Sequence, residues 1–133
     1  MLESYLNKRI KEKEILLMTH IVLGYPSFEE CYKIVEAMVE AGVDLMELQI
    51  PFSEPIADGP VILHASQKAL AAGATVQKSL DFGRKVARDF DIPFLFMTYF
   101  NILYKYGVNR FASDMAQGGL QGAIIPDLPP EEG

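Results

Sequence analysis

The sequence has very little cysteine and a shortage of positive charge, and both absences narrow the class of protein. Cys31 is the only cysteine among 133 residues, so no disulfide can form within the chain. Twelve Lys and Arg residues stand against 18 Asp and Glu residues, which gives a formal charge of −6. A surface of this sign is repelled by nucleic acids and by anionic membranes. We therefore expect neither of them as a partner.

Long apolar segments are missing too. No uncharged run approaches the roughly 20 residues of a membrane-spanning helix, and no signal-peptide core is visible. With 50% hydrophobic and 23% charged residues, the chain nevertheless has the composition of a globular protein with a core. We expect a soluble, cytoplasmic protein.

Four short apolar runs alternate with helical patterns, which predicts an α/β fold with a parallel sheet. Each run is apolar on nearly every residue, as is typical of a strand covered on both faces. The predicted strands are residues 15–23, 44–50, 93–100 and 120–125.

Helix signals lie between these runs. Apolar residues every four positions, at Leu2, Leu6 and Ile10, predict an amphipathic helix that covers one end of the sheet. Further helices are predicted by a capping box at Ser27 and Glu30 with Gly42 as the end, by Pro60 at a first helical position, and by caps at Thr75, Asn109 and Asp127.

The length suggests only part of a larger fold. An eight-stranded β/α barrel needs about 250 residues, and the sequence stops where a fifth β/α step would begin. We therefore expect residues 1–133 to form the N-terminal half of a single TIM-barrel domain: the first helix and about the first four β/α units of a (β/α)8 barrel.

Glu47 is an ionisable residue inside an otherwise apolar predicted strand. Alternation along the strand puts Leu45, Glu47 and Gln49 on one face. Burying a carboxylate costs several kcal/mol unless it is paired or protonated, so a functional group is favoured. The alternative is a salt bridge, or a carboxylate that reaches water at the strand end.

Asp58 lies eleven residues further on, in the loop that follows this strand. Parallel sheets bind ligands at the end where their strands finish. A carboxylate in an apolar wall can act as acid and base, while one in a solvated loop stays ionised and can stabilise positive charge. The local pattern alone favours a turn or cap before Gly59 and Pro60.

Residues 47–60 (ELQIPFSEPIADGP) closely resemble the signature of the tryptophan synthase alpha chain family. Further matching segments follow in the same order and spacing along nearly the whole chain. They are residues 17–19 with 24–26, residues 96–99 with Asn101, and residues 127–129 followed by Glu131 and Glu132.

The resemblance implies a lyase of tryptophan biosynthesis that cleaves indole-3-glycerol phosphate to indole and glyceraldehyde 3-phosphate. It implies that Glu47 is the catalytic acid–base group and that Asp58 stabilises the indolenine tautomer through the ring nitrogen. Leu23, Tyr99 and Ile124 match positions around the indole ring, although ordinary barrel packing explains them equally well. The resemblance also implies a tryptophan synthase beta chain as partner, in an alpha2-beta2 complex, with pyridoxal phosphate in the beta chain and no cofactor or metal in this one.

Three positions depart from the usual family pattern: Gln49 replaces glycine, Glu54 replaces aspartate and Ile102 replaces proline. The Gln49 amide could hydrogen-bond Glu47 at the pocket mouth. His20 and His64 are expected to be packed or surface residues.

Two other functions stay open. One is a non-catalytic half barrel that associates with itself and lacks the phosphate site. The other, more weakly supported, is another two-carboxylate enzyme such as a glycosidase.

Overall fold

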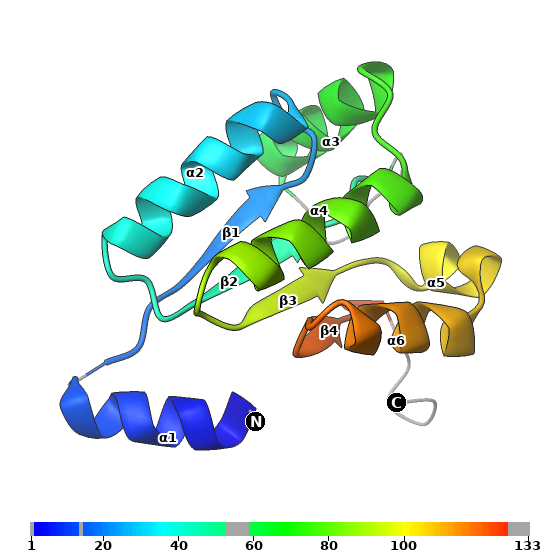
Figure 1. Cartoon of the computed structure of the whole chain (residues 1–133). Helices are drawn as coiled ribbons and strands as arrows, with labels where there is room; N and C mark the ends of the chain where they lie inside the picture. The colour runs from blue at the N-terminus through cyan, green and yellow to red at the C-terminus, as the bar shows by residue number, and fades with distance from the viewer. Residues whose placement is uncertain (1, 14, 53–58, 128–133) are drawn as a thin grey trace.

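Four parallel strands follow one another in the sheet in the same order as in the chain. The computed structural model describes residues 2–13, 15–52 and 59–127 (Figure 1). The strands are β1 (Met18–Val22), β2 (Leu45–Gln49), β3 (Phe94–Met97) and β4 (Gly122–Ile124). The predicted α/β class, the parallel sheet and the four strand positions are confirmed, although each strand is shorter than its apolar run.

Helix α1 (Leu2–Glu12) precedes the first strand. The connections between the strands contain α2 (Phe28–Glu40), then α3 (Pro60–Ala71) and α4 (Val76–Asp89), then α5 (Phe100–Tyr106) and α6 (Val108–Gln117). Helices α2, α4 and α6 lie side by side over one face of the sheet, while α1 lies below the ends where the strands begin (Figure 1). None of the described helices is long and apolar enough to cross a membrane.

Local signals place most helix ends as predicted. The Ser27 hydroxyl accepts the Glu30 N–H at 3.0 Å at the start of α2, and the Thr75 hydroxyl accepts the Lys78 N–H at 3.1 Å at the start of α4. Pro60 is the first residue of α3. Each of these contacts satisfies or removes a backbone N–H that has no partner within its own helix.

The predicted cap at Asn109 is wrong, and so is the extension of the third strand to Phe100. Helix α5 begins at Phe100, and Gly107 separates it from α6 with a φ of 102° that favours glycine. The Gly107 N–H donates to the Leu103 carbonyl at the end of α5, and the Gly107 carbonyl accepts the Phe111 N–H at the start of α6. One glycine thus ends a helix and starts the next, which leaves Asn109 inside α6.

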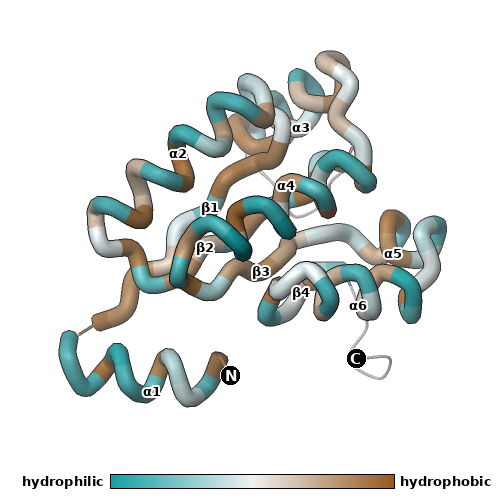
Figure 2. Tube along the Cα trace, in the orientation of Figure 1, coloured by the Kyte–Doolittle hydropathy of each residue, from teal (hydrophilic) through white to brown (hydrophobic). Residues whose placement is uncertain are grey.

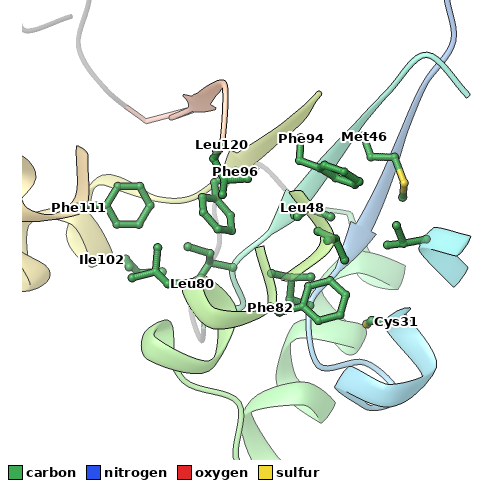
Figure 3. Close-up of a cluster of buried hydrophobic side chains, with 14 of the residues drawn as sticks. Cys31, Met46, Leu48, Leu80, Phe82, Phe94, Phe96, Ile102, Phe111 and Leu120 are labelled. Carbon is green, nitrogen blue, oxygen red and sulfur yellow. The ribbon is translucent and has the colours of Figure 1, made fainter. Parts of the chain in front are cut away.

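The hydrophobic core lies between the sheet and α2, α4 and α6. Figure 2 shows brown, hydrophobic segments in the strands and an alternation of teal and brown residues along the helices in front of them. The core combines alternate strand residues with the inward faces of these helices, as Figure 3 shows. Its members with no exposed surface are Leu23, Cys31, Val35, Met46, Leu48, Ile50, Val86, Phe94 and Phe96.

Gly83 allows α4 to approach β3 closely. A Cβ atom at this position would lie 2.4 Å from Cζ of Phe96, which is fully buried and has no room to move. We expect Gly83→Ala to lower the free energy of unfolding by about 1–3 kcal/mol through overpacking, although alanine favours a helix more than glycine does. Denaturant unfolding measures the change.

A double-mutant cycle provides the control for Gly83. Phe96→Leu removes the ring that the new methyl group would strike, so Gly83→Ala should cost less in that background than in the parent protein. Equal costs in the two backgrounds would contradict the proposed steric contact.

The two outer strands and α1 are more exposed than predicted. Val22 is the one buried residue of β1, and no residue of β4 is buried, because each strand pairs on one side only among the described residues. Their apolar sequences suggest strands covered on both faces, whereas their exposure is that expected of the outer strands of a half barrel. Helix α1 lies at the predicted end of the sheet, but its apolar stripe is only partly covered: Leu2 and Leu6 are half-buried, and Ile10 is 43% exposed.

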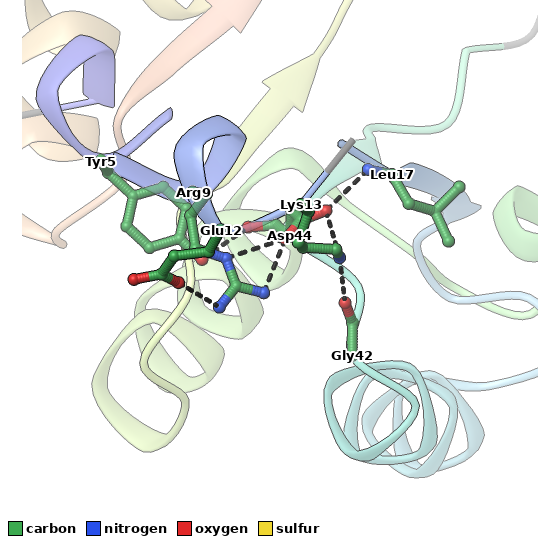
Figure 4. Close-up of polar contacts among 7 residues, drawn as sticks. All are labelled: Tyr5, Arg9, Glu12, Lys13, Leu17, Gly42 and Asp44. Carbon is green, nitrogen blue, oxygen red and sulfur yellow. Dashed lines mark hydrogen bonds and ion pairs between the residues drawn. The ribbon is translucent and has the colours of Figure 1, made fainter. Parts of the chain in front are cut away.

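Polar contacts to Asp44 attach α1 instead (Figure 4). Asp44 directly precedes β2, and its side chain has no exposed surface. One carboxylate oxygen accepts hydrogen bonds from Arg9 Nε and Nη2 at 2.9 and 2.6 Å, and the other accepts from Lys13 Nζ and the Leu17 N–H, both at 2.8 Å. The Tyr5 hydroxyl also donates to the Asp44 carbonyl at 3.0 Å.

These contacts change the ionisation of Asp44. Burial of the carboxylate opposes ionisation, but hydrogen bonds from Lys13, from the Leu17 N–H and from Arg9 outweigh that effect and lower the pKa of Asp44 to about 2. Asp44 therefore ties α1, the segment before β1 and the start of β2 together as a charged group.

Candidate functional site

The face of the sheet opposite α2, α4 and α6 carries the ionisable residues of the strands. Strand register aligns His20, Glu47, Leu95 and Gly122 in one row across this face. The next row toward the carboxyl ends of the strands consists of Val22, Gln49, Met97 and Ile124. In a parallel sheet, neighbours in such a row project to the same side.

Glu47 lies on the face that the sequence predicts. Met46, Leu48 and Ile50 belong to the helix-side core, whereas the Glu47 side chain on the other face is 13% exposed. The alternation that separates Glu47 from the core is therefore confirmed. The carboxylate is largely shielded from water but remains accessible from the open face.

His20 contacts Glu47 directly. Nδ1 of His20 lies 3.0 Å from Oε1 of Glu47, and the His20 side chain is 31% exposed. Sequence reasoning missed this pair because the two residues lie 27 positions apart. The parallel pairing of two adjacent predicted strands was the signal that could have found it, once the register was known.

Gln49 shares the face of Glu47 and is fully buried. It lies between Val22 and Met97 in the sheet, and its backbone carbonyl accepts the Leu23 N–H at 2.9 Å. A hydrogen bond between its amide and Glu47 stays a prediction.

The three residues expected around a ligand lie in different surroundings. Ile124, 36% exposed, lies in the row beside Met97 on the open face. Tyr99 follows β3, is almost fully buried, and stacks on Phe52 with ring centres 5.3 Å apart. Leu23 packs in the helix-side core, so the structure does not bring it to Glu47.

Asp58 lies outside the described residues, as does the helix predicted to begin at residue 129. Phe52 and Gly59 are the described residues nearest to Asp58 in the chain. Asp127 is described, and its carboxylate accepts the Phe100 N–H at 2.8 Å, at the start of α5. That contact links the end of β4 to the helix after β3.

The remaining histidine takes no part in this face. His64 of α3 lies edge-on to Tyr25 with ring centres 6.3 Å apart, in line with the expected packed or surface role. No group of three or more potential metal ligands occurs within the part of the chain that the structure describes.

Helices on one side of a parallel sheet and an ionisable row on the other are the arrangement of a TIM barrel. In that fold the strands curve so that the open face becomes the barrel interior. The fold and site therefore define a β/α barrel, of which this chain provides the first helix and about the first four β/α units.

Comparison with known proteins identifies the particular family. The family model described as "Tryptophan synthase alpha chain" matches residues 6–133, so the chain belongs to the tryptophan synthase alpha chain family. The alpha chain of Desulforapulum autotrophicum is 67% identical over 133 residues, which are all of this chain and 53% of that protein. The alpha chain of Syntrophotalea carbinolica is 65% identical over 99% of this chain and 52% of its own length.

Solved structures agree with the fold. An open form of tryptophan synthase from Mycobacterium tuberculosis matches 98% of this chain and 52% of its own with a TM-score of 0.93 at 33% identity. The tryptophan synthase alpha subunit of Legionella pneumophila gives a TM-score of 0.92 at 35% identity, over 98% of this chain and 50% of its own. The chain spans about half the length of the relatives it matches. The predicted family and barrel fold are confirmed.

Proposed function

We propose that the protein to which these residues belong cleaves indole-3-glycerol phosphate to indole and glyceraldehyde 3-phosphate, as a lyase of tryptophan biosynthesis. The observation that carries this proposal is the position of Glu47, a largely shielded carboxylate on the open face of a barrel sheet, in a chain of this family. Such a group can move protons within hydrogen-bond reach of a bound substrate.

The reaction is a retro-aldol cleavage that needs one proton delivered and one removed. Protonation of indole C3 gives the indolenine, and removal of the proton from the adjacent glycerol hydroxyl breaks the carbon–carbon bond. The bonding electrons return to the ring, so indole leaves and an aldehyde forms. Glu47 supplies and takes these protons, and Asp58 stabilises the positive charge at the ring nitrogen.

The indole ring is proposed to lie along the open face above the Glu47 row. Ile124 supports this placement because it is exposed on that face, and Tyr99 is the other proposed ring neighbour. Leu23, which packs in the helix-side core with no exposed surface, is not placed against the ring. Barrels of this class hold phosphate at the loops after strands seven and eight, so the activity is proposed for the whole protein. Residues 1–133 are proposed to form the N-terminal half of that single domain.

The proposed chemistry uses side chains alone, so we propose no cofactor in this chain. A tryptophan synthase beta chain is the proposed partner, in an alpha2-beta2 complex, and pyridoxal phosphate is proposed only in that partner. The family match supports this assembly. A cytoplasmic location is likewise proposed, in keeping with the single cysteine.

A self-associating half barrel without catalytic activity is the second candidate. It is favoured by apolar side chains on the open face, where Met18 is 45% and Ile124 is 36% exposed. Symmetric association of two copies would cover these residues and the free edges of β1 and β4.

One pair of measurements separates the two candidates. The complete product of the gene is supplied with indole-3-glycerol phosphate, and indole and glyceraldehyde 3-phosphate are quantified together. Equal amounts of both products support the lyase, whereas a folded protein that releases neither contradicts it. Analytical ultracentrifugation of the 133-residue chain then tests association, and a dimer without lyase activity in the complete product supports the second candidate.

A further inference from the structure

We propose that His20 is a positioning residue for Glu47: its Nδ1–H donates to Oε1 of the side-chain carboxyl group and holds that group oriented for proton transfer. This inference rests on the proposed lyase function. It starts from the 3.0 Å contact between Nδ1 of His20 and Oε1 of Glu47.

Backbone pairing fixes this contact. His20 and Glu47 are directly paired residues of β1 and β2, and β2 is held on its other side by β3. Groups on paired strands keep their geometry better than groups on loops do. The imidazole therefore reaches the carboxylate from a rigid support, with only 13% of the Glu47 side chain exposed to competing water.

The chemistry of the pair decides which nitrogen carries the proton. An ionised carboxylate only accepts hydrogen bonds, so Nδ1 must be the donor to Glu47. The contact therefore assigns the proton to Nδ1 of His20 and the acceptor role to Oε1 of Glu47.

Within the described part of the chain, no other recorded hydrogen bond reaches the Glu47 carboxylate. Its other row neighbours, Leu95 and Gly122, carry no polar side-chain group. Among nearby charged groups, Asp44 at the start of β2 is held by α1, and Asp127 after β4 is bound to the Phe100 N–H. Neither is recorded in contact with Glu47, so we assign the orientation of Glu47 to His20.

Loss of the imidazole should act on turnover more than on substrate binding. Without a donor, the Glu47 carboxyl group gains rotational freedom. The rate of proton transfer, and with it kcat, should then fall, because the group spends less time in line with the reacting atoms. KM should change little, because the proposed role contacts Glu47 and not the phosphate.

The contact itself can be tested without any activity. The chain has two histidines, so the ring signals of His20 and His64 can be distinguished by NMR. We expect His20 to show the Nδ1–H tautomer in the parent chain, and its ring nitrogen and proton shifts to change in Glu47→Leu, which removes the acceptor of that N–H. His64, on α3 beside Tyr25, is the internal control. Unchanged His20 ring shifts in Glu47→Leu would overturn the pair.

Two substitutions test the positioning role in the complete, active protein. His20→Phe keeps a ring but removes the donor, and should lower kcat by about 10- to 100-fold, the size expected for one charge-assisted hydrogen bond. His20→Asn keeps an N–H donor near the Nδ1 position, and should recover most of that loss.

The outcomes separate this inference from the proposed function. If His20→Phe keeps the parent kcat within about twofold, or if His20→Asn is impaired as severely with a raised KM, the positioning role is wrong. If the parent protein releases no indole while the NMR contact is present, the lyase function fails and the pair remains.

Discussion

Glu47→Gln is expected to lower turnover of indole-3-glycerol phosphate by about 10²- to 10⁴-fold in the complete protein, the range for loss of a general acid–base group. The amide has nearly the shape of the carboxylate but cannot accept and return a proton. Glu47 lies outside the helix-side core, so the substitution removes chemistry without removing packing. The fall should therefore appear in kcat, with the fold unchanged.

Steady-state release of indole measures this effect, and unfolding curves of the same preparations check the fold. Glu36→Gln on α2 is a matched control, since the same chemical change is made at an exposed position of a helix on the opposite face of the sheet (Figure 1). Near-normal turnover in Glu47→Gln, with the control also normal, would contradict the assignment of Glu47 as the acid–base group.

Asp58→Asn is expected to reduce turnover nearly as much. Its proposed role is electrostatic: a carboxylate beside the ring nitrogen stabilises positive charge that develops during the reaction, which a neutral amide does far less well. The effect should differ from that of Glu47→Gln in one respect, because no proton is transferred to Asp58. The residual activity of Asp58→Asn, measured as steady-state release of indole, should thus still depend on Glu47 and fall further in the double variant Glu47→Gln/Asp58→Asn.

The parts of the fold governed by local patterns could be predicted from the sequence. The hydroxyl of Ser27 or Thr75 accepts the N–H of the residue three positions later. The cap can therefore be predicted from a few neighbouring residues. The face of Glu47 follows in the same way from alternation within a single strand. The family signature added Asp58, whose local pattern alone favoured a turn.

Features that depend on distant residues could not be predicted. The pairing of His20 with Glu47 requires the register between two strands, which no local pattern specifies. Helix α5 begins where Asp127, 27 residues later, accepts the Phe100 N–H, and nothing in the local sequence separates Phe100 from the apolar run that precedes it. The exposure of β1 and β4 depends on what lies next to them in space rather than on their own residues.

Asp44 is the other position where a large effect is expected, this time on stability. Its carboxylate is fully buried and accepts four hydrogen bonds, three from the charged groups of Arg9 and Lys13 and one from the Leu17 N–H. Breaking a buried ion pair from one side costs about 3–5 kcal/mol, and the figure is lower when the cations are partly exposed, as they are here. We expect Asp44→Asn to lower the free energy of unfolding by about 2–3 kcal/mol at neutral pH.

The pH dependence identifies the cause of this loss. The pKa of Asp44 is about 2 in the folded chain, against about 3.9 for an unperturbed aspartate. The folded state therefore gains from ionisation of Asp44 at every pH above the unfolded value, and that gain disappears as the pH falls through the folded value. The amide of the Asp44→Asn variant does not titrate, so the difference between parent and variant should be largest above about pH 5 and shrink steadily toward about pH 2.

Denaturant unfolding of both proteins across this pH range measures the difference directly. Subtracting the unfolding free energy of the variant from that of the parent cancels the contributions of acidic groups that both proteins share. Asp89 is one of these groups, and hydrogen bonds from Arg88 and Tyr32 lower its pKa as well. Asp81→Asn on the exposed side of α4 is the matched control and should give a small, pH-independent difference. A difference for Asp44→Asn that stayed constant down to about pH 2 would mean that packing around Asp44, and not its charge, attaches α1 to the sheet.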